Sequence, residues 1–484
     1  MRNADTYSKL VFELSGEGKR GYVLPSLDVD IEVKIPEGMA RQGSALLPSI
    51  SEPELVRHYT LLSQRNYGLD SGMYPLGSCT MKYNPKVNED VAAMAGFSKI
   101  HPLQGQDSTQ GALELLYSLQ CMLCEITGMD KFSLHPAAGA HGEMCGLMMM
   151  KAYHEDRGDF SRNKVIVPDS SHGTNPASAT SAGLEIISIK SAPDGTVDID
   201  ALKSVLSDNV AGLMLTNPNT LGLFEAQITT ISRLVHDAGG LLYYDGANMN
   251  AIMGIAKPAH MGFDVLHLNL HKTFSTPHGG GGPGSGPIGV VKSLEKFLPS
   301  PVVEKTLDAF EFATPEKSIG KIRAFAGNFN VLVKAYCYIL TMGAIGLKLA
   351  SEIAVLNANY LKERLKGPYK LPYEGICMHE FVLDGLEQTA GGVKTLDVAK
   401  RLIDYGFHPP TVYFPLIVEN AIMIEPTETE SLAEIDAFAD AMLAIAKEAL
   451  SDPELLKGAP HTSPVGRVDE LVALKKPVLK YNPD

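Results

Sequence analysis

Apolar positions in the middle of the chain change their period repeatedly, and this change predicts an α/β fold. Short runs of β-forming and apolar residues predict strands at 164–168, 184–190, 211–216, 241–245, 264–270 and 288–291. Apolar spacing of helical period predicts helices at 110–127, 144–153, 177–183, 198–207 and 229–238. Strands that alternate with helices form a mostly parallel sheet covered on both faces, and ligands bind such sheets at the carboxyl ends of the strands.

The two ends of the chain have a different pattern. Residues 1–50 are rich in proline and glycine and lack a regular period, which predicts an extended arm packed over the globular body or over a partner subunit. A helix is expected at 51–66, with Ser51 as its N-cap and Glu54 three residues later. The tail after residue 452 is again rich in proline, glycine and lysine, and we expect it to lie over the surface.

A second, smaller domain is predicted after residue 325. A long apolar helical pattern at 321–350 is followed by a strand at 376–386, a helix at 395–405 capped by Thr395, and a strand at 421–425. A helix at 431–450 begins with a capping box of Ser431 and Glu434. The predicted organisation is an arm with a first helix (1–70), a large α/β domain (71–325), a small α+β domain (326–452) and a tail (453–484).

Composition narrows the class of protein. The 484 residues are 45% hydrophobic and 20% charged, which is ordinary for a globular enzyme, and the net charge of -14 argues against a nucleic-acid-binding face. No apolar run reaches the length expected for a membrane span, and the N-terminus lacks the apolar core of a signal peptide. Six cysteines do not make a disulfide framework in so long a chain, so a cytoplasmic, reduced setting is expected. The Cys121-x-x-Cys124 motif lies in a predicted core helix without a second cysteine pair, and no metal site is predicted.

The strongest chemical signal is Lys272, directly after the strand predicted at 264–270. An unpaired buried ammonium is costly, and burial commonly turns such an amine into a nucleophile able to form a Schiff base. A surface lysine at a strand end is the simpler alternative. The neighbouring His271 and His278 and the run Gly279–Gly282 favour the functional interpretation, since four glycines suit a loop that moves or lies close to a ligand.

Three other features match the needs of an aromatic aldehyde cofactor that carries a phosphate. The small-residue turn at 136–143 opens a helix, whose free N–H groups suit a phosphate. His172 lies in a polar loop and could stack on a ring, and Asp245 ends a strand and could keep a ring nitrogen protonated. Each alone could be structural: an ordinary helix start, a satisfied loop histidine, an N-cap or ion pair. The turn-rich segment 68–84 offers Ser78, Cys79 and Thr80 as a substrate loop, or is an ordinary surface loop.

Several long segments make the sequence similar to the P proteins of the glycine cleavage system, the PLP-dependent glycine dehydrogenases (aminomethyl-transferring). They are Asn269-Leu-His-Lys-Thr-Phe274 with its glycine run, and residues 74–84, 136–143, 171–177, 244–250, 409–415 and 424–428. More narrowly, the chain resembles subunit 2 of the two-chain prokaryotic form. Pro410 departs mildly from the family pattern, in which an alanine often precedes the threonine that is Thr411 here.

The resemblance implies a PLP-dependent enzyme of fold type I that decarboxylates glycine and passes the aminomethyl group to the lipoyl arm of the H protein, releasing CO2. Lys272 would hold pyridoxal 5′-phosphate as a Schiff base, with His172 on the ring and Asp245 at its nitrogen. Ala138, Gly139 and Ala140 would bind the phosphate, with Asn248 and His271 as neighbours. Subunit 1 would be a separate chain, in a heterodimer or a dimer of heterodimers. We expect the run Gly279–Gly282 to form a lip over the entrance for the lipoyl arm.

Three other interpretations stay open on the sequence. The first is a different fold-type I enzyme, an aminotransferase or a cysteine desulfurase; an aminotransferase would need an arginine for the substrate carboxylate, and Arg323 is a candidate. The second is a catalytically silent scaffold for a partner subunit, against which the presence of Lys272, Asp245 and His172 argues. The third is a nucleotide-binding protein, but the sequence has neither a P-loop nor a dinucleotide fingerprint.

Overall fold

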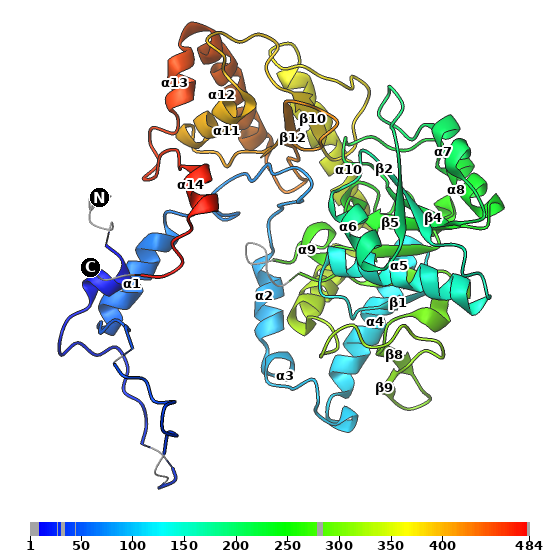
Figure 1. The fold of residues 1–484 in the computed structure, drawn as a ribbon, viewed down its shortest axis with the longest axis horizontal. Coiled ribbons are helices and arrows are strands. Elements are labelled where there is room, and N and C mark those ends of the chain that lie inside the picture. The colour runs from blue at the N-terminus through cyan, green and yellow to red at the C-terminus, as the bar shows by residue number, and fades with distance from the viewer. Residues whose placement is uncertain (1–8, 27, 31–33, 44, 278–283, 482–484) are drawn as a thin grey trace. The chain divides into compact units, whose positions relative to one another are not determined.

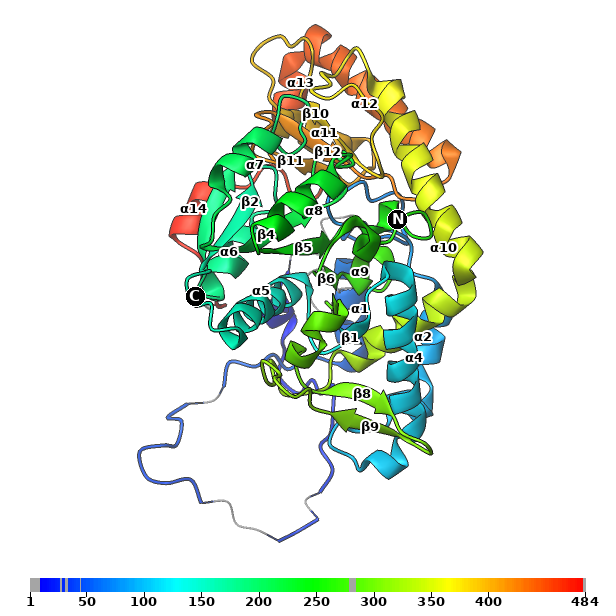
Figure 2. The ribbon, with the colours of Figure 1, turned by 90° about the vertical axis from the view of Figure 1, so that its right-hand side faces the viewer.

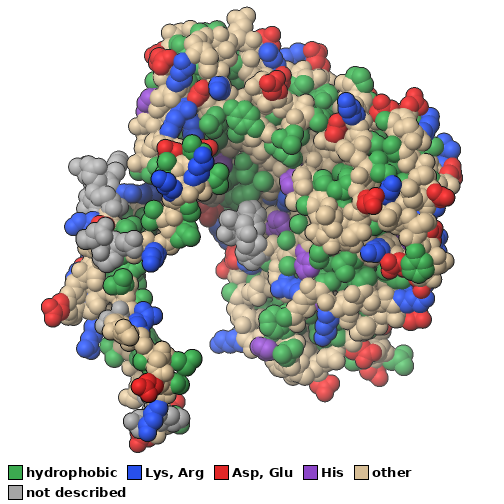
Figure 3. Space-filling model, viewed as in Figure 1, with side chains coloured by type: hydrophobic (Ala, Val, Ile, Leu, Met, Phe, Trp, Pro, Cys, Tyr) green, Lys and Arg blue, Asp and Glu red, His purple; other side chains and the backbone are tan. Residues whose placement is uncertain are grey.

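The computed structural model describes residues 9–26, 28–30, 34–43, 45–277 and 284–481. Its contacts divide the chain into two units, one made of Met1–Ser71 with Pro460–Asp484 and the other of Gly72–Ala459. His278 and the run Gly279–Gly282, on which the predicted lip rests, lie outside the described residues. Side chains of both charges are interspersed over the face shown in Figure 3.

The first unit joins the two ends of the chain. It contains the short helix η2 (Val11–Leu14), α1 (Glu52–Ser63) and α14 (Glu470–Lys475). The rings of Phe12 and Tyr481 stack with centroids 4.7 Å apart, which ties the N-terminal arm to the C-terminal tail. Ser51 and Glu54 form the predicted capping box, in which the Glu54 carboxylate accepts hydrogen bonds from the N–H and hydroxyl of Ser51.

The second unit is built on a seven-stranded sheet with four parallel pairings, as the alternating pattern predicts (Figure 1). In spatial order the strands are β1 (Lys131–Ser133), β7 (Ile288–Val290), β6 (Val265–Leu268), β5 (Leu241–Gly246), β4 (Val210–Thr216), β2 (Lys164–Pro168) and β3 (Glu185–Ile189). β7 pairs antiparallel with both of its neighbours, the edge strand β1 and the inner strand β6. β1 was not predicted, because Phe132 is the one apolar residue among its three.

Helices cover both faces of this sheet (Figure 2). Side chains of α4 (Gln110–Thr127), α7 (Ile199–Val205), α8 (Ile228–Asp237) and α10 (Phe329–Leu365) share one core with strand residues such as Leu213 and Leu266. Those of α5 (Gly139–Asp156) and α6 (Thr174–Ser181) share the other with Met214 and Val265. Neighbouring strand residues thus point to opposite faces. The fully buried Met149 and Met150 show that the methionine-rich stretch of α5 is core.

Two helices begin earlier than predicted. The spacing favoured helices at 144–153 and 177–183, but α5 begins at Gly139 and α6 at Thr174. Their first turns consist of small or polar residues, which carry no apolar period, so the sequence pattern becomes visible only one turn later.

The small sheet and its helices follow α10. The sheet has the order β10 (Phe381–Asp384), β12 (Ala421–Ile424) and β11 (Thr411–Val412). It packs with α11 (Thr395–Asp404), α12 (Leu432–Ser451) and α13 (Pro453–Gly458) around a further hydrophobic core. Because α10 contributes to this core and to that of the large sheet, the domain boundary at residue 325 stays a prediction.

Three further expectations for this region need correction. The pattern at 321–350 belongs to α10, which starts at Phe329 and is interrupted at Gly343, with φ 59° and ψ -178°. Thr395 is the first helical residue of α11 and does not cap it; the preceding N–H, of Lys394, is bound by Asp397. The most apolar stretch of α10 is long enough to cross a membrane by length and composition, although no such run was expected, yet the helix contributes to both cores.

Candidate active site

A cavity of about 260 Å³ opens at the carboxyl ends of β4, β5 and β6. Most of the predicted site residues line it: Ser78, Ala138, Gly139, Ala140, His172, Asp245, Asn248, His271 and Lys272. Cys79 and Thr80 belong to the same turn as Ser78 but do not line the cavity, so their role as a substrate loop stays a prediction. Loops about 100 residues apart in the sequence, from His172 to Lys272, meet here, as their shared strand-end position predicts.

Lys272 lies one turn beyond β6. The short helix α9 (Leu270–Thr273) carries it, so the strand ends two residues before the predicted limit of 270. The side chain is half-buried, and its Nζ donates a hydrogen bond to the backbone oxygen of Ser78 over 2.7 Å. An amine in this position faces the cavity and can react with a carbonyl group inside it.

The small-residue turn and the neighbouring Gly286 form a cradle in which neither Gly139 nor Gly286 has room for a side chain. A Cβ on Gly139 would come within 2.4 Å of the Asn269 amide nitrogen, and a Cβ on Gly286 within 2.1 Å of the Ala138 oxygen. Ala138 is the N-cap of α5, so the first N–H groups of this helix have no partners inside it. Close approach of the backbone at the positive end of a helix dipole fits a phosphate group.

Asp245 is an anion at the end of β5. Its carboxylate accepts hydrogen bonds from Asn175 Nδ2 at 3.0 Å and from the N–H of Ala247 at 3.0 Å, and His267 Nε2 lies 3.4 Å away. Burial alone would raise the pKa of Asp245, but His267 and the two donors outweigh burial and hold that pKa below its ordinary value. A buried carboxylate that stays ionised suits a partner that carries a proton.

His172 lies beside the cavity as a neutral ring. Burial, followed by the positive charge of Lys272, lowers the pKa of His172. The N–H of Thr174 donates to His172 Nδ1 over 3.2 Å, which fixes the ring at the start of α6. The Thr174 hydroxyl donates in turn to Glu143 on α5 over 2.9 Å. A neutral, oriented imidazole can stack on an aromatic ligand without adding charge.

The sequence interpretation missed several residues that line the same cavity: Glu143, Thr174, Thr216, Thr220, Ala247, His267 and Asn269. Most of them lie within or beside segments already singled out, so the segments were found but the orientation of each side chain was not. Arg323, the candidate carboxylate ligand of an aminotransferase, does not line the cavity; it donates to Asn328 over 2.7 Å.

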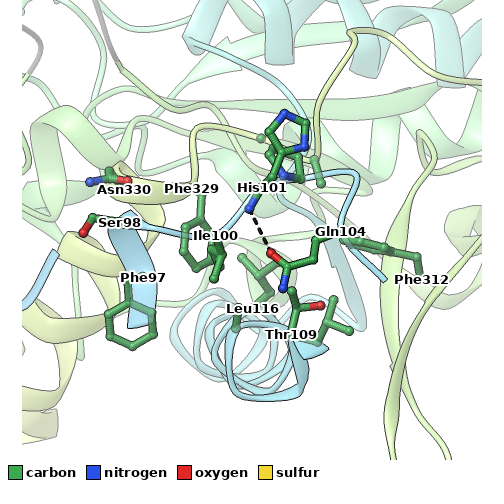
Figure 4. Close-up of a pocket in the computed structure, with 15 residues that line it drawn as sticks. Phe97, Ser98, Ile100, His101, Gln104, Thr109, Leu116, Phe312, Phe329 and Asn330 are labelled. Carbon is green, nitrogen blue, oxygen red and sulfur yellow. Dashed lines mark hydrogen bonds between the residues drawn. The ribbon is translucent and has the colours of Figure 1, made fainter. Parts of the chain in front are cut away.

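Two other features of the described residues, a second cavity and the Cys121-x-x-Cys124 motif, offer fewer reactive groups. A second cavity, of about 210 Å³, lies beside α4 and α10 and is mostly apolar, with His101 as the titratable side chain in its lining (Figure 4). The two thiols of the Cys121-x-x-Cys124 motif are free, and burial raises the pKa of Cys124 to about 12. Such a thiol is unlike a redox-active cysteine, which has a lowered pKa.

Comparisons with known proteins identify the family of the chain. The family profile "Glycine dehydrogenase, C-terminal domain" matches residues 350–460, and "Aminotransferase class-V" matches residues 160–281. The "Probable glycine dehydrogenase (decarboxylating) subunit 2" of Caldanaerobacter subterraneus subsp. tengcongensis is 65% identical over 480 residues, 98% of this chain and 99% of that protein. The protein of the same name from Alkaliphilus oremlandii is 60% identical over 98% of each chain.

Solved structures show the same fold. The chain matches a crystal structure of glycine decarboxylase (P-protein) of the glycine cleavage system in inhibitor-bound form, with a TM-score of 0.70 and 19% identity over 87% of this chain and 92% of that one. It also matches the glutamate decarboxylase of Lactobacillus brevis, with a TM-score of 0.66 and 13% identity over 91% and 98%. The predicted fold type I of PLP-dependent enzymes is confirmed.

Proposed function

The chain belongs to the family of glycine dehydrogenase (decarboxylating) subunit 2, and we propose that its cavity is the site of glycine decarboxylation. The enzymes of this fold family use pyridoxal 5′-phosphate. The observation that carries the proposal is the position of Lys272 Nζ in one cavity with a side-chain-free cradle and an ionised carboxylate.

Each group of the cofactor has a matching group in the cavity. The cradle of Ala138, Gly139 and Ala140 would hold the phosphate, because a ligand can approach its N–H groups closely. Asp245 would pair with the ring nitrogen, His172 would lie on the ring, and Lys272 would bind the aldehyde. When bound, pyridoxal 5′-phosphate supplies an electron sink for the carbanion that loss of CO2 leaves behind.

The residues of this chain would then control protons and solvent. Asp245 stays ionised at neutral pH, so it keeps a proton on its partner nitrogen. The backbone oxygen of Ser78 is an acceptor for Lys272 Nζ whenever that amine is free of the cofactor, which gives the displaced lysine a defined place. Asn248 lines the cavity, is buried and donates to the backbone oxygen of Pro218 over 2.9 Å, so its side chain has a fixed position.

We further propose the partners and the compartment. The relatives are named as a subunit 2, which supports a separate subunit 1 that completes the enzyme as a heterodimer or a dimer of heterodimers. The aminomethyl group would pass to the lipoyl arm of the H protein. All six cysteines are free thiols, which supports the reduced cytoplasm as the compartment.

Exchange of CO2 between bicarbonate and glycine tests the proposal. The chain would be assayed with pyridoxal 5′-phosphate and lipoylated H protein, with and without a subunit 1 chain. We expect exchange and a visible cofactor band in the wild type, loss of both in Lys272→Ala, and retention of both in Lys292→Ala, whose lysine lies on the surface. Transamination of a panel of amino acids without glycine exchange would instead indicate an aminotransferase.

A further inference from the structure

Two buried carboxylates stand opposite each other at one end of the small sheet. Phe381 of β10 pairs with Ile424 of β12, so the next positions of the antiparallel pair are Glu380 and Glu425. Both side chains are fully buried. Like charges directly opposite each other in a sheet repel, and burial strengthens the repulsion. Two ionised carboxylates in this position would therefore be unstable.

Both carboxylates hold the turn that contains Ser78. The N–H of Ser78 donates to Glu380 Oε2 over 2.8 Å, and the N–H of Thr80 donates to Glu425 Oε2 over 2.8 Å. Ser78 and Thr80 have φ values of 62° and 48°, a left-handed conformation that side chains other than glycine rarely adopt. Such strain persists only where surrounding contacts fix it.

The same turn touches Lys272. The oxygen of Ser78 accepts the hydrogen bond from Lys272 Nζ over 2.7 Å, while its N–H is bound by Glu380. Ser78 thus links Glu380 directly to the lysine of the cavity, and Glu425 holds the same turn two residues later. Asn248, which lines the cavity, also donates to Glu380 over 3.3 Å.

The charged groups around the pair allow it one negative charge. Burial and then the charge of Glu425 raise the pKa of Glu380 well above its ordinary value, and burial raises the pKa of Glu425 to about 7. His379 Nε2 lies 3.8 Å from an oxygen of each carboxylate, but burial lowers the pKa of His379 to about 3, so the ring is neutral.

The other groups that face the cluster are Lys272, Lys82, Glu428 and Cys79. Lys82 is already paired with Glu428 over 2.7 Å, and burial raises the pKa of Cys79, which keeps this thiol neutral. Lys272 is therefore the cation left to balance the pair. One shared proton leaves one negative charge, which matches that single cation.

We propose that Glu380 and Glu425 together carry one proton, fix the 77–80 turn and present one negative charge to Lys272. The pair are positioning residues, because they act on the lysine through the turn and through their charge. This inference rests on the proposed function in so far as Lys272 binds the cofactor. It adds a specific role for the small sheet in placing a negative charge near that lysine.

A divalent cation is the competing occupant of this cluster. His379 and the two glutamates each offer an atom within 4.8 Å of the others, and both nitrogens of His379 and Glu425 Oε1 have no hydrogen-bond partner among the described residues. The proton is favoured because Lys272 and Lys82 already bring positive charge to the cluster. Each carboxylate also has one oxygen bound to a backbone N–H.

Glutamine substitutions separate the charge of the pair from its hydrogen bonds. Glu380→Gln and Glu425→Gln each keep an oxygen for the turn and mimic the protonated form, whereas the double variant removes the charge completely. Glu225→Gln is the matched control, because Glu225 is also buried and accepts backbone N–H groups, but belongs to the loop after β4. The full chain is measured with its cofactor, with subunit 1 and with lipoylated H protein.

We expect each single variant to lower kcat by about threefold at most, and the double variant to lower it by about thirtyfold. The pH at which the visible cofactor band shifts should fall by about one unit in the double variant, because a facing anion favours the protonated cation. The control should keep the wild-type midpoint. Single effects that simply multiply in the double variant, with no change of midpoint, would overturn the proposal.

A measurement on the cofactor-free chain keeps this test separate from the proposed function. Amide hydrogen exchange of the peptide around residues 74–84 should quicken, relative to the rest of the chain, as the pH rises above about 7 in the wild type, where the proton that remains on Glu380 is lost. Glu425→Gln should remove this change, and an unchanged pH profile in that variant would overturn the proposal. A stoichiometric divalent metal that disappears in His379→Ala would overturn it in favour of a cation site. Absence of the cofactor band in the wild type would instead contradict the proposed function.

Discussion

Asp245 and Glu425 are both fully buried carboxylates at the carboxyl ends of strands, yet their pKa values are shifted in opposite directions. The pKa of Asp245 is lowered and that of Glu425 is raised to about 7, although burial raises both and Lys272 lowers both. The difference lies in the remaining neighbours. Asp245 has His267, Asn175 and a backbone N–H around it, whereas Glu425 has one backbone N–H and faces Glu380.

The comparison shows that position at a strand end does not determine the charge of a carboxylate. Two hydrogen-bond donors and His267 keep Asp245 ionised at neutral pH, which suits a fixed partner in the cavity. Burial, with the charge of Glu428, raises the pKa of Glu425 to about 7, so its charge depends on pH near neutrality, which suits a group that responds to a nearby lysine. Substitutions of Asp245 and of Glu425 should therefore differ in the kind of effect as well as in its size.

Asp245→Asn should give the largest effect. The amide keeps the volume but cannot hold a proton on a partner nitrogen, and its own NH2 group would face the donors of Asn175 and Ala247. We expect kcat for glycine–bicarbonate exchange to fall by about a thousandfold or more. A variant within tenfold of the wild type would show that Asp245 is structural; the cofactor content measured by absorbance controls for loss of binding.

Lys82→Met should have the next largest effect, on stability. Lys82 is buried and donates to Glu428 at 2.7 Å and to Asn250 at 2.8 Å. Removing one partner of a buried pair leaves the other charge without compensation, which costs about 3–5 kcal/mol in the free energy of unfolding. Urea unfolding measures this loss.

The double variant Lys82→Met with Glu428→Gln is the control for that loss. It removes both charges, so it should recover most of the stability. Equal loss in the single and double variants would mean that packing of the lysine chain matters more than its charge.

The residues at the end of the large sheet and those at the end of the small sheet also differ in how far the sequence predicts them. Lys272, His172 and Asp245 lie at the carboxyl ends of three parallel strands of one sheet, so the rule of shared strand ends was enough to bring them together. Glu380 and Glu425 belong to a second sheet, and their contact with the Ser78 turn spans about 300 residues or more. Nothing in a local pattern predicts such a contact, although Glu425 lies in a segment that carried the family resemblance.

The cradle was predicted only in part for a different reason. Its small residues were visible, but the start of α5 at Gly139 was not, because glycine and alanine carry no apolar period. The need for glycine at position 286 comes from the approach of the Ala138 oxygen, a contact between segments that lie far apart in the sequence. Tertiary contacts of this kind become visible only in the folded chain.

Gly286→Ala tests whether the cradle holds the phosphate. Its Cβ would lie 2.1 Å from the Ala138 oxygen, so the backbone that holds the phosphate must shift. We expect the Kd for pyridoxal 5′-phosphate to rise by about tenfold, measured by titration of the cofactor-free chain. Gly173→Ala, next to His172, is the matched control, since a Cβ there meets nothing within 4 Å. An equal rise in both variants would contradict the assignment of the cradle.

The smallest expected effect is on the pH dependence of stability, where the two carboxylates should act in opposite directions. The raised pKa of Glu425 means that its contribution to the free energy of unfolding is full below about pH 4.5 and is lost as the pH rises through about 7. The lowered pKa of Asp245 means that its contribution is full above about pH 3.8 and is lost as the pH falls further. Urea unfolding at a series of pH values should therefore show a flatter profile between about pH 4.5 and 7 in Glu425→Gln, and a flatter profile below about pH 3.8 in Asp245→Asn. The same flattening in both variants would remove the contrast between the two sides of the cavity, because it would mean that one shared group sets both profiles.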